Sequence, residues 1–132
     1  EMKVKKITDV LLKNIDAHDF FVVNFPNADM VGHTGNFNAT IKAVQDVDHE
    51  LGRIVTQFPG IIFITADHGN CEEKQGRYLT AHTRNKVPLI MVNTKGEVKG
   101  KLSSGGLADV APTILNIMKI QKPKEMDGKC LL

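Results

Sequence analysis

Apolar positions in the first 26 residues change from helical spacing to an unbroken run. Four apolar side chains recur on one face between lysines, at Val4, Ile7, Leu11 and Ile15. This spacing predicts an amphipathic helix from Met2 to Ile15, which would cover one face of a sheet. The run Phe20–Phe25 is apolar except for one asparagine, and Pro26 closes it. Such a run is typical of a strand buried on both faces of a parallel sheet.

The two patterns recur in the next forty residues. Residues 27–35 are expected to form a loop. A second helical period then runs from Phe37 to Phe58, with Asn36 as its expected N-cap and Pro59-Gly60 as its stop. Residues Ile61–Thr65 are again apolar and β-branched, and they predict a second strand. Strand, helix and strand in this order predict a right-handed βαβ unit, and therefore an α/β fold.

The C-terminal half has weaker signals. Residues 66–86 are polar and show no period, which predicts a long loop of the kind that usually carries function. Residues Val87–Val92 predict a third strand, and Pro88 favours an edge position for it. A last helix is expected from Asp109, as N-cap, to about Lys119, with Pro112 tolerated in its first turn.

Composition excludes several classes of protein. The chain has 132 residues, of which 42% are hydrophobic, and this suffices for one domain with its own core. A net charge of +2 with scattered basic residues gives no sign of a nucleic-acid or polyanion binder. Two distant cysteines, no secretory segment and no apolar run of about 18 residues favour the reducing cytoplasm over export or a membrane.

Polar clusters follow two of the predicted strands. Asp29 and His33 come after the first strand, Asp67 and His68 follow the second, and His82 lies in the long loop. Ligands of open α/β sheets bind at the carboxyl ends of the strands, so these side chains are expected at one edge. Carboxylate and imidazole together form a ligand set for zinc, manganese or iron. Five such groups suffice for more than one ion.

Each of these residues taken alone has an ordinary explanation. An aspartate after a strand is more often a turn or cap residue than a metal ligand, and a single histidine is also more often not a ligand. The joint interpretation as a metal site is favoured, because like-charged groups gathered at buried strand ends need a cation. Cys71 lies beside the second cluster and is interpreted as a small packing residue, since its thiolate would be a soft ligand among harder ones.

Four motifs in the chain resemble a known enzyme family. They are Phe21–Phe25 with Asp29–Gly35, Ile64–Asn70, Ala81–Thr83 with Val87–Ile90, and Gly105–Leu115. In this combination they are similar to the cofactor-independent (2,3-bisphosphoglycerate-independent) phosphoglycerate mutases of the alkaline phosphatase superfamily. The likeness covers essentially the whole chain, which corresponds to only the last part of the longer family enzymes.

The resemblance implies a fold. It is a three-layer α/β/α architecture with a mostly parallel sheet, like that of alkaline phosphatase, and incomplete in this chain. Residues 1–132 would be the C-terminal segment of the metal-binding, phosphatase-like domain. The N-terminal strand region and the inserted transferase domain, which holds the substrate, would lie outside the chain, so substrate-binding residues stay unassigned.

The resemblance also implies an activity. Enzymes of this family are isomerases of glycolysis and gluconeogenesis, and they interconvert 3-phosphoglycerate and 2-phosphoglycerate through a phosphoserine intermediate with two manganese ions. Asp29, His33 and His82 would form one complete site, and Asp67 and His68 would form half of the second. The remaining ligands, an aspartate and the nucleophilic serine, are not in this chain, which is therefore expected to lack a catalytic residue and to be inactive alone.

Two other interpretations stay open. A different metal-dependent phosphomutase or phosphatase of the same superfamily would share the Asp-His-Gly motif, and a non-catalytic metal-binding domain would use only the three-ligand site. A small-molecule phosphoglycerate partner is expected, with no nucleic acid and no membrane. An absent upstream strand would leave a sheet edge unpaired, so the isolated chain is expected to self-associate.

Overall fold

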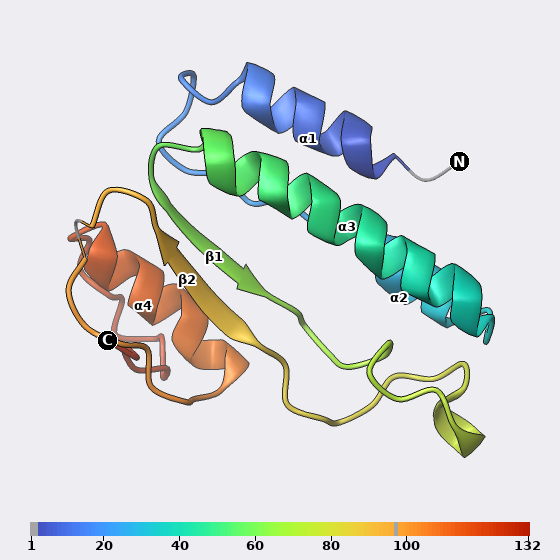
Figure 1. The fold of residues 1–132 in the computed structure, drawn as a ribbon. Helices are drawn as coiled ribbons and strands as arrows, with labels where there is room; N and C mark the ends of the chain where they lie inside the picture. The colour runs from blue at the N-terminus through green and yellow to red at the C-terminus, as the bar shows by residue number, and fades with distance from the viewer. Residues whose placement is uncertain (1–2, 97) are drawn as a thin grey trace.

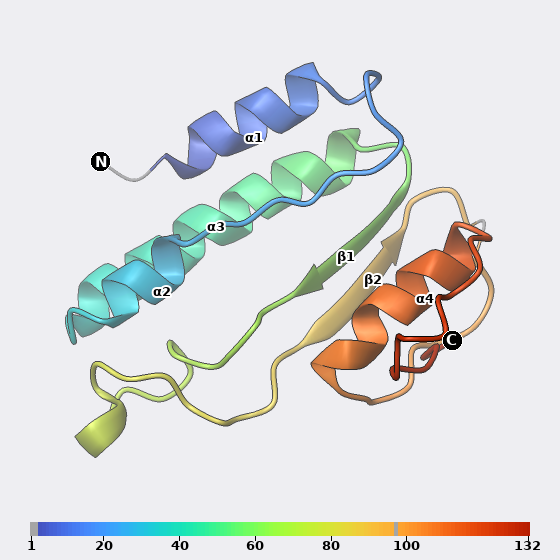
Figure 2. The same ribbon diagram turned by 180° about the vertical axis from the view of Figure 1, so that it is seen from behind.

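The computed structural model of the protein describes residues 3–96 and 98–132. Its elements, in chain order, are α1 (Val4–Lys13), α2 (Asn27–Gly32), α3 (Phe37–Gln57), β1 (Ile61–Thr65), β2 (Leu89–Asn93) and α4 (Val110–Ile117), with 3-10 turns at Gly76–Tyr78 and Leu107–Asp109. Figure 1 shows α1 and α3 side by side on one side of a two-stranded sheet, with α4 on the other side, and Figure 2 shows the same layers from behind. The chain is thus of the α/β class.

Helix α1 confirms the first predicted helix with shorter bounds, because it ends at Lys13 and not at Ile15; Met2, the predicted start, lies outside the described residues. Its buried residues are Val4, Thr8 and Leu11, whereas Ile7 and Ile15 of the predicted apolar stripe are half-buried. The Thr8 hydroxyl donates to the Val4 carbonyl at 3.3 Å, so this buried polar group is satisfied within the helix. Helix α1 packs on α3 through its buried face.

Helix α3 begins and ends where the sequence predicts. The Asn36 side chain accepts a hydrogen bond from the Ala39 amide at 3.0 Å, which satisfies one of the free N–H groups of the first turn. At the other end the helix stops at Gln57, before the Pro59-Gly60 pair. Arg53 joins α3 to α1 by donating to Asp9 at 2.7 Å, and it also donates to Glu50 of α3 at 2.6 Å.

The expected loop 27–35 contains a short helix, α2, so this prediction is wrong for Asn27–Gly32. Pro26 occupies the N-cap position with φ of −76°, and its carbonyl accepts the Met30 amide at 3.0 Å. Proline has a φ suited to a helix start, and Asp29 adds a negative charge in the first turn. A helix of six residues is too short for hydrophobic periodicity to reveal it, and its contacts with α3 support it instead.

The predicted strand Phe20–Phe25 is not formed, and the expected parallel pair is absent from the described residues. Strand β1 pairs only with β2, in the antiparallel sense, from Ile61 opposite Asn93 to Thr65 opposite Leu89. The segment 20–25 is extended and runs along α3 into α2 (Figure 2). Within the described chain no backbone hydrogen bond links it to another segment. A run of apolar residues predicts burial and extension, but it cannot supply the neighbouring strand that a sheet requires.

The third predicted strand is confirmed with shifted bounds, because β2 begins at Leu89, one residue after Pro88. The last helix is also confirmed, although α4 follows a 3-10 turn. Asp109 stands at its N-cap position, but its carboxylate accepts the amides of Gly106 and Lys129, each at 2.8 Å. It therefore fastens the C-terminal segment to the start of α4 rather than capping the helix.

Candidate metal centre

The short helix α2 and its C-cap residue present two of the predicted ligands together. Asp29 and His33 are four residues apart, which places both side chains on one face of the helix. The His33 amide donates to the Asp29 carbonyl at 3.1 Å, so helical geometry continues to the second ligand. Gly35 then adopts a φ of +69°, which glycine tolerates, and the chain turns toward α3.

The third ligand comes from the long loop. His82 precedes Thr83, whose backbone amide donates to the Gly69 carbonyl at 2.8 Å in an isolated antiparallel bridge. Thr83 is also buried, so both this hydrogen bond and the packing of Thr83 restrict the backbone beside His82. The two ends of the loop between β1 and β2 are thereby joined next to the site.

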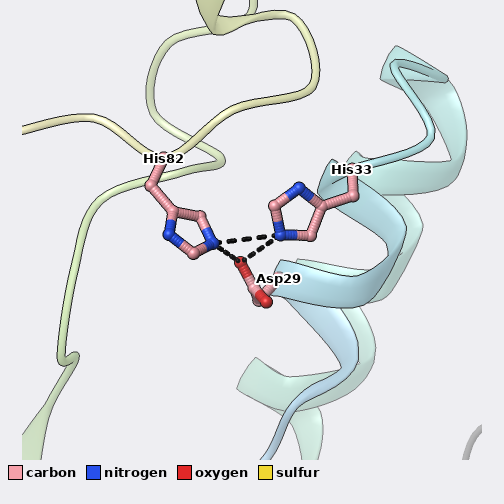
Figure 3. A group of neighbouring side chains, drawn as sticks. All are labelled: Asp29, His33 and His82. Atoms are coloured by element: carbon pink, nitrogen blue, oxygen red, sulfur yellow. Dashed lines mark hydrogen bonds and ion pairs between the residues drawn. The ribbon is translucent and has the colours of Figure 1, made fainter.

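The three ligand atoms converge on one small volume, as Figure 3 shows. Asp29 Oδ1 lies 3.3 Å from His33 Nε2 and 3.2 Å from His82 Nε2, and the two Nε2 atoms are 3.0 Å apart. Ligand atoms that hold one cation at about 2.1 Å, in octahedral or tetrahedral arrangement, lie about 3.0 to 3.4 Å from one another. The observed separations therefore fit a single divalent cation.

The donor set agrees with that fit. One carboxylate and two imidazoles suit a borderline divalent metal, and three protein ligands leave coordination positions open for substrate or water. The His33 ring is also oriented for this role. Its Nδ1 lies 2.8 Å from the Thr80 carbonyl oxygen, which can only accept, so Nδ1 carries the hydrogen and Nε2 keeps a lone pair facing the cluster.

The second predicted pair lies at the border of this cluster. The His68 ring stacks on His82, with ring centroids 3.6 Å apart and planes 19° apart, and its Nε2 is 4.0 Å from Asp29 Oδ1. The Asp67 side chain is 88% exposed, and its carboxylate lies 3.6 Å from His68 Nε2. Neither residue belongs to the three-residue group, so a second ion held by this pair would need ligands from elsewhere.

The comparison with protein families decides the assignment. The sequence profile of the Metalloenzyme superfamily matches residues 1–122. The chain belongs to the metalloenzyme superfamily. This membership agrees with the geometry, because the matched range contains every residue of the cluster.

This metalloenzyme chain is also similar to curated proteins named 2,3-bisphosphoglycerate-independent phosphoglycerate mutase. It is 49% identical to the protein of Clostridium acetobutylicum, 47% identical to that of Moorella thermoacetica and 46% identical to one from Cereibacter sphaeroides. These alignments cover 99 to 100% of the chain and 26 to 27% of each relative. The chain spans about a quarter of the length of these relatives and corresponds to a C-terminal portion of them. In the described residues, no helix combines the length and apolar character that crossing a membrane requires.

The electrostatics of the metalloenzyme site favour an ionised Asp29. Partial burial of the Asp29 carboxyl raises its pKa, but the hydrogen bond from Asn70 and the neighbouring imidazoles lower it more. The Asn70 amide donates to Asp29 Oδ1 at 2.6 Å and to the Asp29 carbonyl at 3.3 Å. The carboxylate thus keeps its negative charge at neutral pH, as a metal ligand must.

Sequence reasoning did not single out the residues behind the ligands. Asn70 and Thr83 are both 5% exposed, and both are hydrogen-bonded directly or indirectly to the site. Only their position next to His68 and His82 could have drawn attention to them. Cys71 is half-buried, as its interpretation as a packing residue requires, and its thiol donates to the Ala28 carbonyl at 3.1 Å. Burial raises the pKa of this thiol.

Proposed function

We propose that this chain is the metal-binding segment of a phosphoglycerate mutase, an isomerase of glycolysis and gluconeogenesis that interconverts 3-phosphoglycerate and 2-phosphoglycerate through a phosphoserine intermediate. The observation that carries the proposal is the convergence of Asp29 Oδ1, His33 Nε2 and His82 Nε2 within 3.0 to 3.3 Å. The names of the relatives supply the reaction, and the open coordination positions leave room for a phosphoryl group.

The ions in this proposal are two manganese ions. The three-ligand cluster would hold one of them, and Asp67 with His68 would contribute half of the second site. The remaining ligands, an aspartate and the nucleophilic serine, would come from a part of the relatives that this chain does not span. Bound divalent cations lower the pKa of a hydroxyl and neutralise phosphoryl oxygens, which is the chemistry that phosphoryl transfer needs.

The chain's own side chains support this chemistry in distinct ways. Asp29 is ionised and supplies the negative charge, while the Thr80 carbonyl fixes the orientation of His33. His68, stacked on His82, lies close enough to serve a neighbouring ion without entering the first cluster. The exposed Asp67 carboxylate is free to meet groups that come from outside this chain.

The proposal includes the architecture of the whole protein. There, residues 1–132 would belong to the phosphatase-like domain, and segment 20–25 would join a mostly parallel sheet within a three-layer α/β/α fold. The support is that Phe20, Val22 and Val23 are 52%, 84% and 37% exposed, which is unusual for an apolar run. A neighbouring strand from outside this chain would pair with the backbone of this segment, and the layers of the complete fold would cover these side chains. The proposed site of the reaction is the cytoplasm.

An assay of the whole protein tests this function. The purified, manganese-loaded protein is expected to convert 3-phosphoglycerate, whereas the 132-residue chain alone is expected to show no turnover. Turnover of ribose phosphates instead would indicate another phosphomutase, and hydrolysis of phosphomonoesters alone would indicate a phosphatase. Metal binding by the whole protein without turnover of any of these substrates would indicate a non-catalytic metal-binding domain. Each of these three outcomes contradicts the proposal.

A further inference from the structure

The Glu72 carboxylate collects three hydrogen bonds behind the metal cluster without touching it. Its Oε2 accepts the Asn70 backbone amide at 2.7 Å. Its Oε1 accepts the Thr83 hydroxyl and also the Asn85 side-chain amide, the latter at 3.1 Å. We call this group the Glu72 clamp: Glu72 with its three donors on Asn70, Thr83 and Asn85.

The clamp joins the two ends of the long loop between β1 and β2. Asn70 lies near the start of this loop, and Thr83 and Asn85 lie near its end. The two ends are closely apposed at the Gly69–Thr83 bridge, where a Cβ on Gly69 would overlap both Glu72 Oε1 and Thr83 Oγ1. Thr83 follows His82 directly. The hydrogen bond that the Thr83 hydroxyl donates to Glu72 therefore limits where the His82 backbone can lie.

The clamp reaches the other side of the cluster through Asn70. The backbone of Asn70 is bound by Glu72, and its side-chain amide donates to Asp29 Oδ1, the oxygen that faces both histidines. This amide is also packed against α2, because a Cβ on Gly32 would lie 2.5 Å from Asn70 Oδ1. Asn70 is a neutral donor, so it orients the carboxylate without replacing a cation.

We propose that Glu72 is a positioning residue for the cluster, because its bonds to Asn70 and Thr83 hold Asp29 and His82 at the separation that one divalent cation requires. A carboxylate suits this task since it only accepts, and all three partners donate. Glutamine would turn an NH₂ group toward at least one donor and would lose that contact. The inference rests on the proposed function only for the presence of a metal ion.

Metal titration of matched variants tests the clamp. Glu72→Gln is compared with Glu73→Gln, an adjacent acid that contacts Asn85 but neither Asn70 nor Thr83. In calorimetric titration with Mn²⁺, Glu72→Gln is expected to raise Kd about 10- to 100-fold, as changes behind metal ligands commonly do, and Glu73→Gln to leave it unchanged. Equal Kd values for Glu72→Gln and the wild-type chain would overturn the proposal.

A second pair of variants covers the case in which Glu72→Gln does not fold. Thr83→Ser keeps the hydroxyl and is expected to bind Mn²⁺ like the wild type, whereas isosteric Thr83→Val loses it and is expected to bind more weakly. If Glu72→Gln folds, the double variant Glu72→Gln/Thr83→Val is expected to lose little more Mn²⁺ affinity than either single variant. The reason is that both substitutions remove the same hydrogen bond, the one between Thr83 and Glu72. Full additivity, or equal binding by the Thr83→Ser and Thr83→Val chains, contradicts the clamp.

A metal-free measurement separates this inference from the proposed function. Nuclear Overhauser contacts between the His33 and His82 rings are expected in the wild-type chain without metal, and they are expected to weaken in Glu72→Gln but not in Glu73→Gln. Unchanged contacts in Glu72→Gln overturn the clamp whether or not metal binds. If the variants behave as expected but the whole protein does not turn over 3-phosphoglycerate, the clamp stands and only the proposed function is contradicted.

Discussion

The helix pair α1–α3 and the metal cluster differ in the interactions that form them. The helix pair buries Val4, Leu11 and Ile54 with partners from within the chain, and both helices follow the periodicity of the sequence. The cluster brings together ligands from α2 and from a loop about fifty residues later, and its neighbours include a half-exposed histidine and an exposed aspartate. The first region is a local hydrophobic structure, and the second depends on contacts that are distant in sequence and suited to an added cation.

Removal of one metal ligand is expected to give the largest effect, a loss of Mn²⁺ affinity, and to leave the helix pair unchanged. Structural metal sites gain about 10 to 16 kcal/mol from four ligands, so one ligand contributes about 3 kcal/mol, or roughly 100-fold in affinity. His82→Ala is therefore expected to weaken Mn²⁺ binding by at least about 100-fold in calorimetric titration. His49→Ala, an exposed histidine on α3, is the control. Similar losses in both variants would show that the cluster is not the binding site.

Truncation of a side chain in the α1–α3 interface is expected to lower the free energy of unfolding and to leave Mn²⁺ affinity unchanged. Leu11 is buried between α1 and α3, so Leu11→Ala is expected to lower the free energy of unfolding by about 2 to 3 kcal/mol. Val10→Ala, at an exposed position of the same helix, is the control and is expected to change it by less than about 0.5 kcal/mol. Urea denaturation followed by circular dichroism measures both. A comparable loss of Mn²⁺ affinity in folded Leu11→Ala would show that the two regions are not independent.

The exposed segment 20–25 belongs to neither region and is expected to drive self-association. Its backbone groups are free to pair with a second copy, and its apolar side chains favour contact over solvent. Light scattering of the isolated chain is expected to show oligomers that Val22→Lys dissociates, while Val44→Lys on the exposed side of α3 does not. A wild-type chain that stays monomeric throughout the micromolar range contradicts this expectation.

The smallest effect is expected from Asp109, far from both regions. Hydrogen bonds from the backbone amides of Lys129 and Gly106 lower the pKa of its carboxyl from 3.8. A carboxyl whose pKa is lower in the folded state stabilises the fold above its unfolded pKa, and this contribution is lost as pH falls through the folded value. Asp109→Asn is therefore expected to be slightly less stable than wild type at neutral pH, with a difference that shrinks in strong acid. Urea unfolding over a pH series measures this, with Asp127→Asn as the control.

Prediction from sequence succeeded where one segment carries its own signal. The periodicity of α1, the Asn36 cap and the Pro59-Gly60 stop of α3 are local, and the structure confirms them. It failed for α2, which is too short to show a period, and for segment 20–25, whose strand character needs a partner. The proposed ligands stood out as residue types after apolar runs, but the Glu72 clamp did not, because polar residues in a long loop carry no spacing that reveals their partners.

The amino-acid sequence alone determined the helices α1, α3 and α4, the apolar segments, and the Asp and His residues whose chemistry suits a divalent cation. Only the tertiary structure decided that β1 and β2 pair antiparallel, and that Asp29, His33 and His82 meet while Asp67 stays exposed. The physical reason is the range of the interactions. Helical hydrogen bonds and caps connect residues a few positions apart, whereas strand pairing and ligand convergence depend on where distant segments are brought by the packing of the whole chain.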